Sequence, residues 1–262
     1  MSDQYAVIGN PIEHSKSPQI HAGFAQQTNQ DLVYKKILCD NFAETARDFF
    51  AKGGKGLNIT VPFKGDAFEF ADQLSPLAQQ AKAVNTLKLM GDGSIFGDNT
   101  DGIGLVRDLV ENNSCPIKNT NILILGAGGA ARGVIPALLV ENPQQITVAN
   151  RTVSKAQDLT GVIGCGFDDL AGQYFDIIIN ATSASLNNEV PAIPKNIIKV
   201  GGMTYDLMYS KKPTAFVIWG RDTFASQSLD GLGMLVEQAA ESFYLWRDIR
   251  PDTKDAIRLL RH

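Results

Sequence analysis

The sequence lacks the features that mark secreted, membrane-spanning and metal-binding proteins. It has three cysteines in 262 residues and no CxxC pair, which argues against a disulfide framework and against a structural zinc site. No apolar run approaches the roughly 20 residues needed to span a bilayer, and no basic stretch leads into an apolar one near the N-terminus. We therefore expect a cytoplasmic protein that does not bind membranes.

An excess of positive charge is also missing. Lys and Arg number 24 against 28 Asp and Glu, a net charge of −4, so no basic field attracts nucleic acid. The three histidines are scattered, without the spacing of metal ligands, and no metal site is expected. Hydrophobic residues make up 44% of the chain, as in globular proteins with a core. We expect small-molecule partners, with monomer and homodimer both left open.

Short apolar runs alternate with segments of helical periodicity, which predicts an α/β protein with parallel sheet. In the first half, Ser17 and Pro18 indicate the start of a helix, and Asp40 is expected to cap a second helix that ends at Gly53-Gly54. Strands are expected at 5–8, 32–38, 57–61, 121–125, 146–149 and 176–179. Four further helices are expected. One begins near residue 100, one ends near residue 140, one begins near residue 153, and the last runs from residue 230 onward.

A glycine-rich turn directly follows the expected strand at 121–125 and directly precedes a helix. Its residues match the pattern GxGxxA and are Gly126, Ala127, Gly128, Gly129, Ala130 and Ala131. Gly126 permits a tight turn, Gly128 lets the backbone approach a pyrophosphate, and free N–H groups at the helix start hold the phosphates. The second half of the chain is therefore expected to bind a dinucleotide.

The end of the next strand indicates which dinucleotide. Sites for NAD carry a carboxylate there for the ribose 2′-hydroxyl, whereas this chain has Asn150, Arg151 and Thr152, with Lys155 one helical turn later. A guanidinium suits a 2′-phosphate, and two cations at a helix start oppose the helix dipole unless they bind an anion. The expected cofactor is NADP(H).

Four polar clusters in the first half are hard to explain as folding devices. They are 10–18, 58–64, 85–86 and 97–102, and the first two follow strands, where the ligands of α/β folds collect. Together with the glycine turn and the segments 150–152, 180–183 and 230–234, they resemble the shikimate dehydrogenase family over nearly the whole chain. The resemblance implies an oxidoreductase of aromatic amino acid and chorismate biosynthesis that reduces 3-dehydroshikimate to shikimate with NADPH.

The resemblance also implies roles for single residues. Lys64 and Asp101 would form the acid/base pair, since hydride arriving at a carbonyl carbon requires a proton donor at the oxygen. Taken alone, Lys64 also fits a surface residue and Asp101 a helix N-terminal charge. By the same resemblance, the substrate carboxylate would be bound by Ser15 and Ser17, its hydroxyls by Asn58, Thr60, Asn85, Asp101 and Gln238, and the cofactor by Thr182 and Gly231 as well as the turn. Tyr205 fits either a substrate contact or a packing residue.

The fold class that follows is a two-domain α/β protein. Residues 1–101 and 234–262 are expected to form a substrate-binding catalytic domain with a mostly parallel sheet, and residues 102–233 a Rossmann-like NADP-binding domain. The C-terminal helix is thereby expected to return to the first half, with Gln238 on the same face as Leu235 and Ala239. Gly231 and Gly233 are expected to make the approach to this helix flexible.

Two segments depart from the family pattern. Ser185 stands where the family has glycine after the motif at 180–183, and Pro213 and Thr214 occur in the reverse of the usual order. Two other functions remain open: a broader quinate/shikimate dehydrogenase, which an acidic residue in place of Arg151 would favour, and a non-catalytic NADPH sensor, against which both Lys64 and Asp101 argue.

Overall fold

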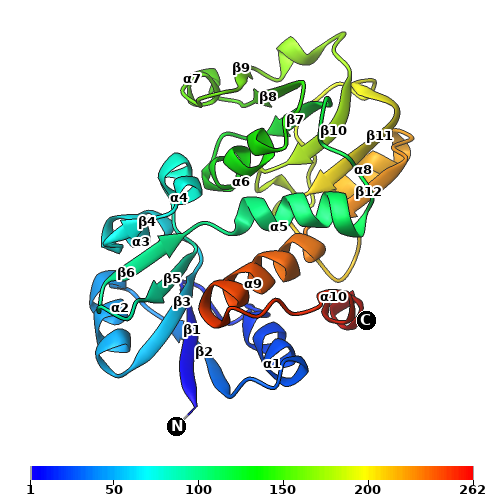
Figure 1. Cartoon of the computed structure of the whole chain (residues 1–262). Helices are drawn as coiled ribbons and strands as arrows, with labels where there is room; N and C mark the ends of the chain where they lie inside the picture. The colour runs from blue at the N-terminus through cyan, green and yellow to red at the C-terminus, as the bar shows by residue number, and fades with distance from the viewer. Residues whose placement is uncertain (1, 262) are drawn as a thin grey trace. The chain divides into compact units, whose positions relative to one another are not determined.

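The structure is a computed structural model that describes residues 2–261, and it divides into two compact units (Figure 1). Unit 1 contains the residues up to Gly104 together with Leu235–Leu260, and unit 2 contains Leu105–Met234. The chain leaves unit 1 within helix α5 (Asp101–Arg107) and returns to it within helix α9 (Leu232–Arg247). Each unit is built on one sheet.

The sheet of unit 1 is mixed, with six strands among the described residues in the order β2-β1-β3-β5-β6-β4. β1 pairs in parallel with both β2 and β3, whereas β5 is antiparallel to β3 and to β6. The expected strands of the first half are present, and a hairpin that the sequence analysis did not predict completes the sheet. The strands are β1 (Asp3–Gly9), β2 (Leu32–Leu38), β3 (Gly54–Ile59), β4 (Gln73–Leu74), β5 (Thr86–Leu89) and β6 (Ile95–Asp98).

Two expected helix caps in unit 1 are wrong, although the helices start and end near the expected residues. The side chain of Asn41, not of Asp40, accepts the capping bond of α2 (Phe42–Ala51) from the N–H of Glu44, at 3.3 Å. α2 ends as expected before Gly53, whose φ is +89°, and Gly54 begins β3. α1 (Ser17–Gln27) starts at Ser17 as expected, but Lys16 occupies the cap position and no side chain caps the helix. Neighbouring polar residues compete for a cap, and local sequence does not decide among them.

Helices cover both faces of this sheet. On one face, α2 and α3 (Lys64–Phe70) pack with Ala6, Ile8 and Leu57 in a shared core. A second core joins α1 to the C-terminal part of the chain through Ile20, Phe24, Val236, Ala239, Ala240 and Phe243. The C-terminal segment is two helices, α9 and α10 (Lys254–Arg261), because a break that contains Pro251 separates them. The remaining helix of this unit is α4 (Pro76–Ala81).

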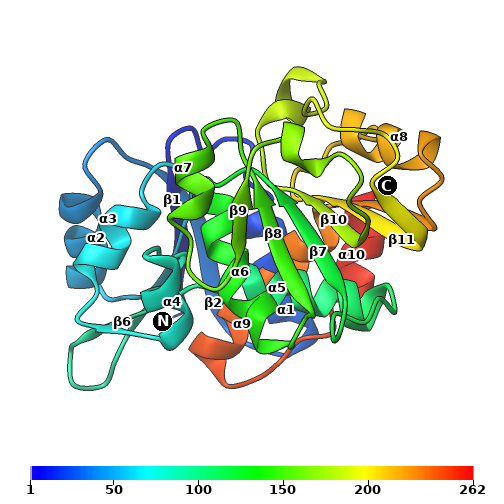
Figure 2. The same cartoon turned by 90° about the horizontal axis from the view of Figure 1, so that it is seen from above.

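Unit 2 has an all-parallel sheet in the order β12-β11-β10-β7-β8-β9 among the described residues, the doubly wound order of dinucleotide-binding folds. Figure 2 shows this strand order from the opposite edge of the sheet, with β9, β8, β7, β10 and β11 side by side. The strands are β7 (Asn121–Leu125), β8 (Gln145–Ala149), β9 (Ile163–Cys165), β10 (Phe175–Asn180), β11 (Ile198–Asp206) and β12 (Gln227–Asp230). The predicted two-domain α/β fold class is confirmed, with a mixed first sheet.

Alternate residues of β7 face two different cores, as expected of a strand buried on both sides. Ile122 and Ile124 pack toward α6 (Gly129–Val140) and η1 (Asp108–Asn112), whereas Leu123 and Leu125 pack toward α8 (Ala215–Asp222). The other helical segments of unit 2 are α7 (Val153–Gln157), η2 (Asp168–Leu170) and η3 (Ala184–Asn187). Within residues 2–261 no helix is both long and apolar enough to cross a membrane.

Candidate functional site

The order of strands in unit 1 reverses between β1 and β3, and the loops that follow these two strands lie side by side. Asn10 donates its backbone N–H to the carbonyl of Val61 at 3.1 Å, and Thr60 donates to Ile8 at 2.9 Å. Ligands of open α/β sheets bind at such a reversal, outside the carboxyl ends of the strands. The two polar clusters predicted as functional therefore share the expected position.

Lys64 and Asp101, which lie far apart in the chain, form an ion pair in unit 1. The Lys64 Nζ lies 2.5 Å from the Asp101 Oδ2, and the side chains are 27% and 12% exposed. Lys64 is the first residue of α3, because β3 stops at Ile59, two residues before the expected end of this strand, and a turn intervenes. Asp101 is the first residue of α5, where a negative charge suits the helix N-terminus. A partly accessible ammonium is thus held by a largely buried carboxylate.

Asn85 and Gln238 extend this pair. The Asn85 Nδ2 donates to the Asp101 Oδ1 at 2.8 Å and lies 3.4 Å from the Gln238 Oε1. The Gln238 Nε2 donates to the carbonyl of Leu235 at 2.9 Å. Gln238 is half-buried, whereas Asn85 is only 2% exposed. Of the two amides, Gln238 therefore offers more surface to a ligand.

The remaining predicted substrate residues lie on the two loops and on β3. Ser15 and Ser17 hydroxyls lie 3.2 Å apart, with Ser15 half-buried and Ser17 8% exposed. Thr60 is half-buried. Asn58 is 6% exposed, and its Oδ1 accepts a hydrogen bond from the Tyr34 hydroxyl at 2.7 Å. Since the Asn58 Nδ2 already donates to Thr86 and Ser242, a further contact of this side chain falls to the second lone pair of its oxygen.

The structure adds polar residues to which the sequence analysis gave no role. Thr86, Thr100 and Ser242 are 0% exposed and contact Asn58, Asn85 or both. Thr86 and Thr100 belong to recognised polar clusters, but a short polar side chain in such a cluster does not reveal its partner. In the sequence, Ser242 is marked only by its position, four residues after Gln238 on a largely apolar helix.

Tyr205 lies inside unit 2. Its side chain is 0% exposed, and its hydroxyl donates to the Asp108 Oδ2 at 2.6 Å and accepts from the Met234 N–H at 3.3 Å. Burial, together with the nearby carboxylate of Asp108, raises the pKa of Tyr205 well above its ordinary value. These contacts support the packing role rather than the substrate contact.

The glycine turn joins β7 to α6 as expected. Gly126 has a φ of +99°, and a Cβ there would lie 3.0 Å from the Thr182 Cγ2, so glycine is required for both conformation and space. Gly128 and Gly129 are exposed, and a Cβ on either would meet nothing within 4 Å. The first N–H groups of α6 have no partner within the helix. An open, exposed cradle of N–H groups fits a dinucleotide pyrophosphate.

The loop after β8 and the helix α7 that follows it carry the basic residues. The Asn150 Oδ1 accepts from the Ala127 N–H at 3.2 Å, and its Nδ2 donates to the Thr152 carbonyl at 2.8 Å, so Asn150 holds the turn against this loop. Arg151, Thr152 and Lys155 are exposed, and no ion pair with a carboxylate involves Arg151 or Lys155 in the described part of the chain. Both cations are available to a phosphate.

The two departures from the family pattern meet at one carboxylate. The hydroxyls of Ser185 and Thr214 each donate to the Asp206 Oδ2 at 2.6 Å, and Thr214 also caps α8 by accepting from the Val217 N–H. Burial raises the pKa of Asp206, and these hydrogen bonds oppose that rise. Ser185 thereby ties the loop after β10 to β11.

Gly231 is buried, and a Cβ there would lie 2.3 Å from the carbonyl oxygen of Leu207. The residue is glycine because two backbones meet closely, which is a different reason from the flexibility expected from the sequence. Gly233 is crowded in the same way, since a Cβ there would lie 2.0 Å from the Asp108 Oδ1. The approach to α9 is packed, not open.

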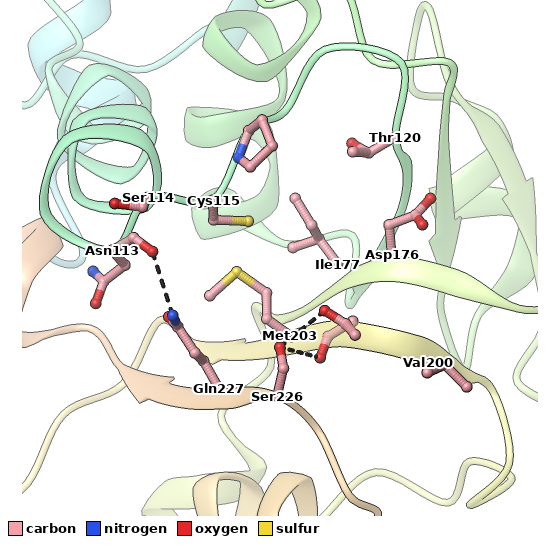
Figure 3. Close-up of a pocket in the computed structure, with 13 residues that line it drawn as sticks. Asn113, Ser114, Cys115, Thr120, Asp176, Ile177, Val200, Met203, Ser226 and Gln227 are labelled. Atoms are coloured by element: carbon pink, nitrogen blue, oxygen red, sulfur yellow. Dashed lines mark hydrogen bonds between the residues drawn. The ribbon is translucent and has the colours of Figure 1, made fainter.

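A cavity of about 230 Å³ lies elsewhere in unit 2, at the amino ends of β10, β11 and β12 (Figure 3). Cys115 and Asp176 line it, and Gln227 donates to the Asn113 carbonyl across its rim. Burial raises the pKa of Cys115 to about 11, so its thiol is not a nucleophile at neutral pH. Asp176 is paired with Lys199 at 2.8 Å.

Among the described residues no group of His, Cys, Asp and Glu is arranged to hold a metal.

Comparison with known proteins identifies the family. Residues 7–87 match the shikimate dehydrogenase substrate binding domain, residues 108–190 match shikimate / quinate 5-dehydrogenase, and residues 231–261 match the shikimate 5′-dehydrogenase C-terminal domain. A Cellvibrio japonicus protein named shikimate dehydrogenase (NADP(+)) is 54% identical over 270 residues, covering 100% of this chain and 98% of that relative. The chain belongs to the shikimate dehydrogenase family.

Solved structures agree with this membership. An Ael1 enzyme from Pseudomonas putida is 45% identical, with a TM-score of 0.93 over 100% of this chain and 99% of that one. The Thermus thermophilus shikimate 5-dehydrogenase in complex with NADP(H) and shikimate is 29% identical, with a TM-score of 0.87 over 98% of this chain and 99% of that one. The predicted family is confirmed, and the predicted enzyme class and cofactor are those in the curated relatives' names.

Proposed function

We propose that this chain catalyses the reversible NADPH-dependent reduction of 3-dehydroshikimate to shikimate, with Lys64 as the general acid/base. The observation that carries the proposal is the Lys64–Asp101 pair, 2.5 Å apart between Nζ and Oδ2 and partly open to solvent. The names of the relatives support the reaction and the cofactor. Unit 1 is proposed as the substrate-binding unit and unit 2 as the cofactor-binding unit.

NADPH, when bound, supplies the hydride that reduces the carbonyl carbon. The pyrophosphate would be held by Gly126, Ala127, Gly128, Gly129 and Ala130, with Asn150 supporting the turn from behind. Arg151, Thr152 and Lys155 would bind the 2′-phosphate, for which a guanidinium is the better ligand. Thr182 lies next to Gly126 and would contact the cofactor from the neighbouring loop, whereas the burial of Gly231 makes its role one of packing.

Lys64 moves the proton. In the reductive direction its ammonium gives a proton to the carbonyl oxygen as negative charge develops there, and the neutral amine takes the proton back in oxidation. Asp101 holds the ammonium in place and stabilises its charge, since the largely buried carboxylate interacts with a cation more strongly than one in water does. The Asn85 amide fixes the other oxygen of that carboxylate.

The substrate is a small acid with several hydroxyls, and each hydroxyl left unpaired in a closed site costs about 1–3 kcal/mol. Ser15 and Ser17 would donate to the carboxylate. Thr60 and Gln238, both half-buried, would bind hydroxyls directly. Asn58 and Asn85 are already hydrogen bonded within the protein, so each would share its remaining capacity with the substrate.

The test is the absorbance of NADPH with purified protein, NADP and shikimate, repeated with quinate in place of shikimate and with NAD in place of NADP. We expect turnover with shikimate and NADP and much slower turnover in the other pairings. Equal rates with quinate would establish the broader dehydrogenase instead, and NADP binding without turnover of either acid would establish a sensor. The oligomeric state and the cytoplasmic location stay predictions.

A further inference from the structure

We propose that Thr86 is a positioning residue for the acid/base pair, and that it acts together with Ser242 by orienting the amides of Asn85 and Asn58. This inference rests on the proposed function. The interior of unit 1 contains a group of uncharged polar side chains at positions where apolar residues are usual. Thr86, Thr100 and Ser242 are each 0% exposed.

The orientation of the Asn85 amide is decided by its partners. The backbone N–H of Thr100 lies 2.9 Å from the Asn85 Oδ1, and an N–H can only donate, so the atom that faces it must be the oxygen. The Thr86 hydroxyl donates to the same oxygen at 2.9 Å. The Nδ2 is therefore turned toward Asp101, where it donates to Oδ1 at 2.8 Å.

This orientation gives each oxygen of Asp101 its own partner. The Asn85 Nδ2 donates to Oδ1, and the Lys64 ammonium contacts Oδ2. Asn85 thereby fixes the position of the carboxylate that holds the Lys64 ammonium. Three hydrogen bonds, through Asn85 and Asp101, connect the Thr86 hydroxyl to the Lys64 ammonium.

The Thr86 hydroxyl also connects the second amide. It accepts from the Asn58 Nδ2 at 3.1 Å while it donates to Asn85, and it lies 2.8 Å from the Ser242 hydroxyl. When Thr86 donates to Asn85, only Ser242 can donate in their mutual contact, and its one proton is then shared between Thr86 and the Gln238 carbonyl at 3.0 Å. Ser242 also accepts from the Asn58 Nδ2 at 2.9 Å. The Thr86 hydroxyl on β5 and the Ser242 hydroxyl on α9 thus orient the amides of Asn58 and Asn85.

Burial makes this arrangement sensitive to the loss of one hydroxyl. No water reaches fully buried atoms to replace a lost partner, and a buried polar group left unpaired is costly. Removal of the Thr86 hydroxyl leaves the Asn58 Nδ2 and the Asn85 Oδ1 each with one partner fewer. The Thr100 N–H and hydroxyl, at 2.9 and 3.1 Å, still hold the Asn85 oxygen, so the amide would tilt about these contacts without flipping. A tilted amide would weaken its hydrogen bond to Asp101 and misplace the Lys64 ammonium.

The experiment compares Thr86→Val, which has the same shape without the hydroxyl, with Thr86→Ser, which keeps the hydroxyl. Thr204→Val is the matched control, because Thr204 is 0% exposed on β11 of unit 2 and its hydroxyl donates to Ser228 at 2.7 Å. We expect Thr86→Val to lower kcat for shikimate oxidation roughly 10-fold while the KM for NADP stays unchanged. Thr86→Ser should restore kcat to within about 2-fold, and Thr204→Val should lower only the melting temperature.

A wild-type kcat in folded Thr86→Val would overturn the inference, as would an equal loss of kcat in Thr204→Val. If Thr86→Val does not fold, Ser242→Ala takes its place, with the same loss of kcat expected and an unchanged kcat as the contrary result. Inactivity of the wild-type protein toward shikimate would instead refute the proposed function, so the two failures are distinguishable.

Discussion

Arg151 is the residue whose removal is expected to separate the two nicotinamide dinucleotides. Its guanidinium is exposed beside the glycine turn, and no ion pair with a carboxylate involves it among residues 2–261. We expect Arg151→Ala to weaken NADPH binding by about 1.5–3 kcal/mol, the range for a hydrogen bond to a charged group, with little effect on NADH. Titration of both cofactors by protein fluorescence measures this difference. Equal losses would place the 2′-phosphate elsewhere.

His21 makes the stability of the protein depend on pH. Burial lowers its pKa to about 3 against an opposing interaction with the Asn58 side chain, and neither ring nitrogen makes a hydrogen bond of normal geometry among the described residues. The ring instead stacks on Tyr34, with centroids 4.2 Å apart. Since the unfolded chain has a His pKa of about 6.5, it binds one more proton than the folded chain between pH 6.5 and 3, so stability falls as the pH is lowered through this window.

The variant His21→Phe keeps the ring and removes the titration. Between pH 6.5 and 5 we expect the wild type to lose about 2 kcal/mol more unfolding free energy than His21→Phe does. Urea unfolding at the two pH values measures it. The exposed His14 provides the control, because His14→Gln should keep the wild-type pH dependence. Parallel pH dependences in wild type and His21→Phe would show that His21 is accessible to protons in the folded state.

Sequence reasoning identified side chains better than it identified their partners. Lys64, Asp101, Asn85 and Gln238 were selected, and the structure brings them together. Their contacts could not be predicted from the chain, because each depends on where elements far apart in sequence pack. Ser242 was missed for the same reason, since its neighbours come from β3, β5 and the start of α5.

At the scale of elements, two glycines of the turn before α6 have different roles, one in stability and one in cofactor binding. Gly126 has a φ of +99° and a crowded Cβ position, whereas Gly128 has a φ of −83° and open space. Gly126→Ala is expected to cost about 1–2 kcal/mol of stability, the penalty for a left-handed alanine. Gly128→Ala should leave the stability of the free protein unchanged and weaken NADP binding, because the added methyl group stands where the pyrophosphate approaches.

Thermal unfolding without cofactor and NADP titration of both variants check this pair. Gly126→Ala is the destabilised variant in this account, and Gly128→Ala is the one with a stable fold and poor binding. The same loss of stability in both, with normal NADP affinity in Gly128→Ala, would contradict the assignment of the turn.

Helix α9 supplies Gln238 to the Asp101 side of unit 1. We expect Gln238→Ala to raise the KM for shikimate several-fold, to leave the KM for NADP nearly unchanged, and to lower stability by no more than about 1 kcal/mol. Steady-state kinetics with each substrate varied gives both constants, with Gln227→Ala in unit 2 as the control. Strong destabilisation with a normal KM for shikimate would make Gln238 a structural residue.

Element types followed from the sequence more reliably than element ends. The apolar strands at 32–38 and 121–125 match the structure residue for residue. The ends depend on local competition: Asn41 caps α2 next to Asp40, and Lys64 begins a helix because a turn follows Ile59. The hairpin of β5 and β6 was not predicted, because its strands are four residues each and alternate only weakly.

At the scale of the whole molecule, the chain folds into two units, to which we assign separate chemical tasks. Unit 1 contains the proposed proton donor and substrate residues, and unit 2 the proposed cofactor cradle. The C-terminal part of α9 belongs to unit 1, which local sequence could not decide, since an apolar helical face fits either sheet. Family resemblance, carried by motifs from both ends of the chain, supplied that placement.

The most direct test of this account is the turnover of shikimate with NADP by Lys64→Ala. We expect a protein with wild-type melting temperature and NADP affinity whose kcat is lower by roughly 10² to 10⁴, the usual contribution of a positioned general acid or base. Lys52→Ala, at an exposed ion pair with Asp48, is the matched control and should retain full activity. A folded Lys64→Ala protein that oxidises shikimate at the wild-type rate would contradict the account.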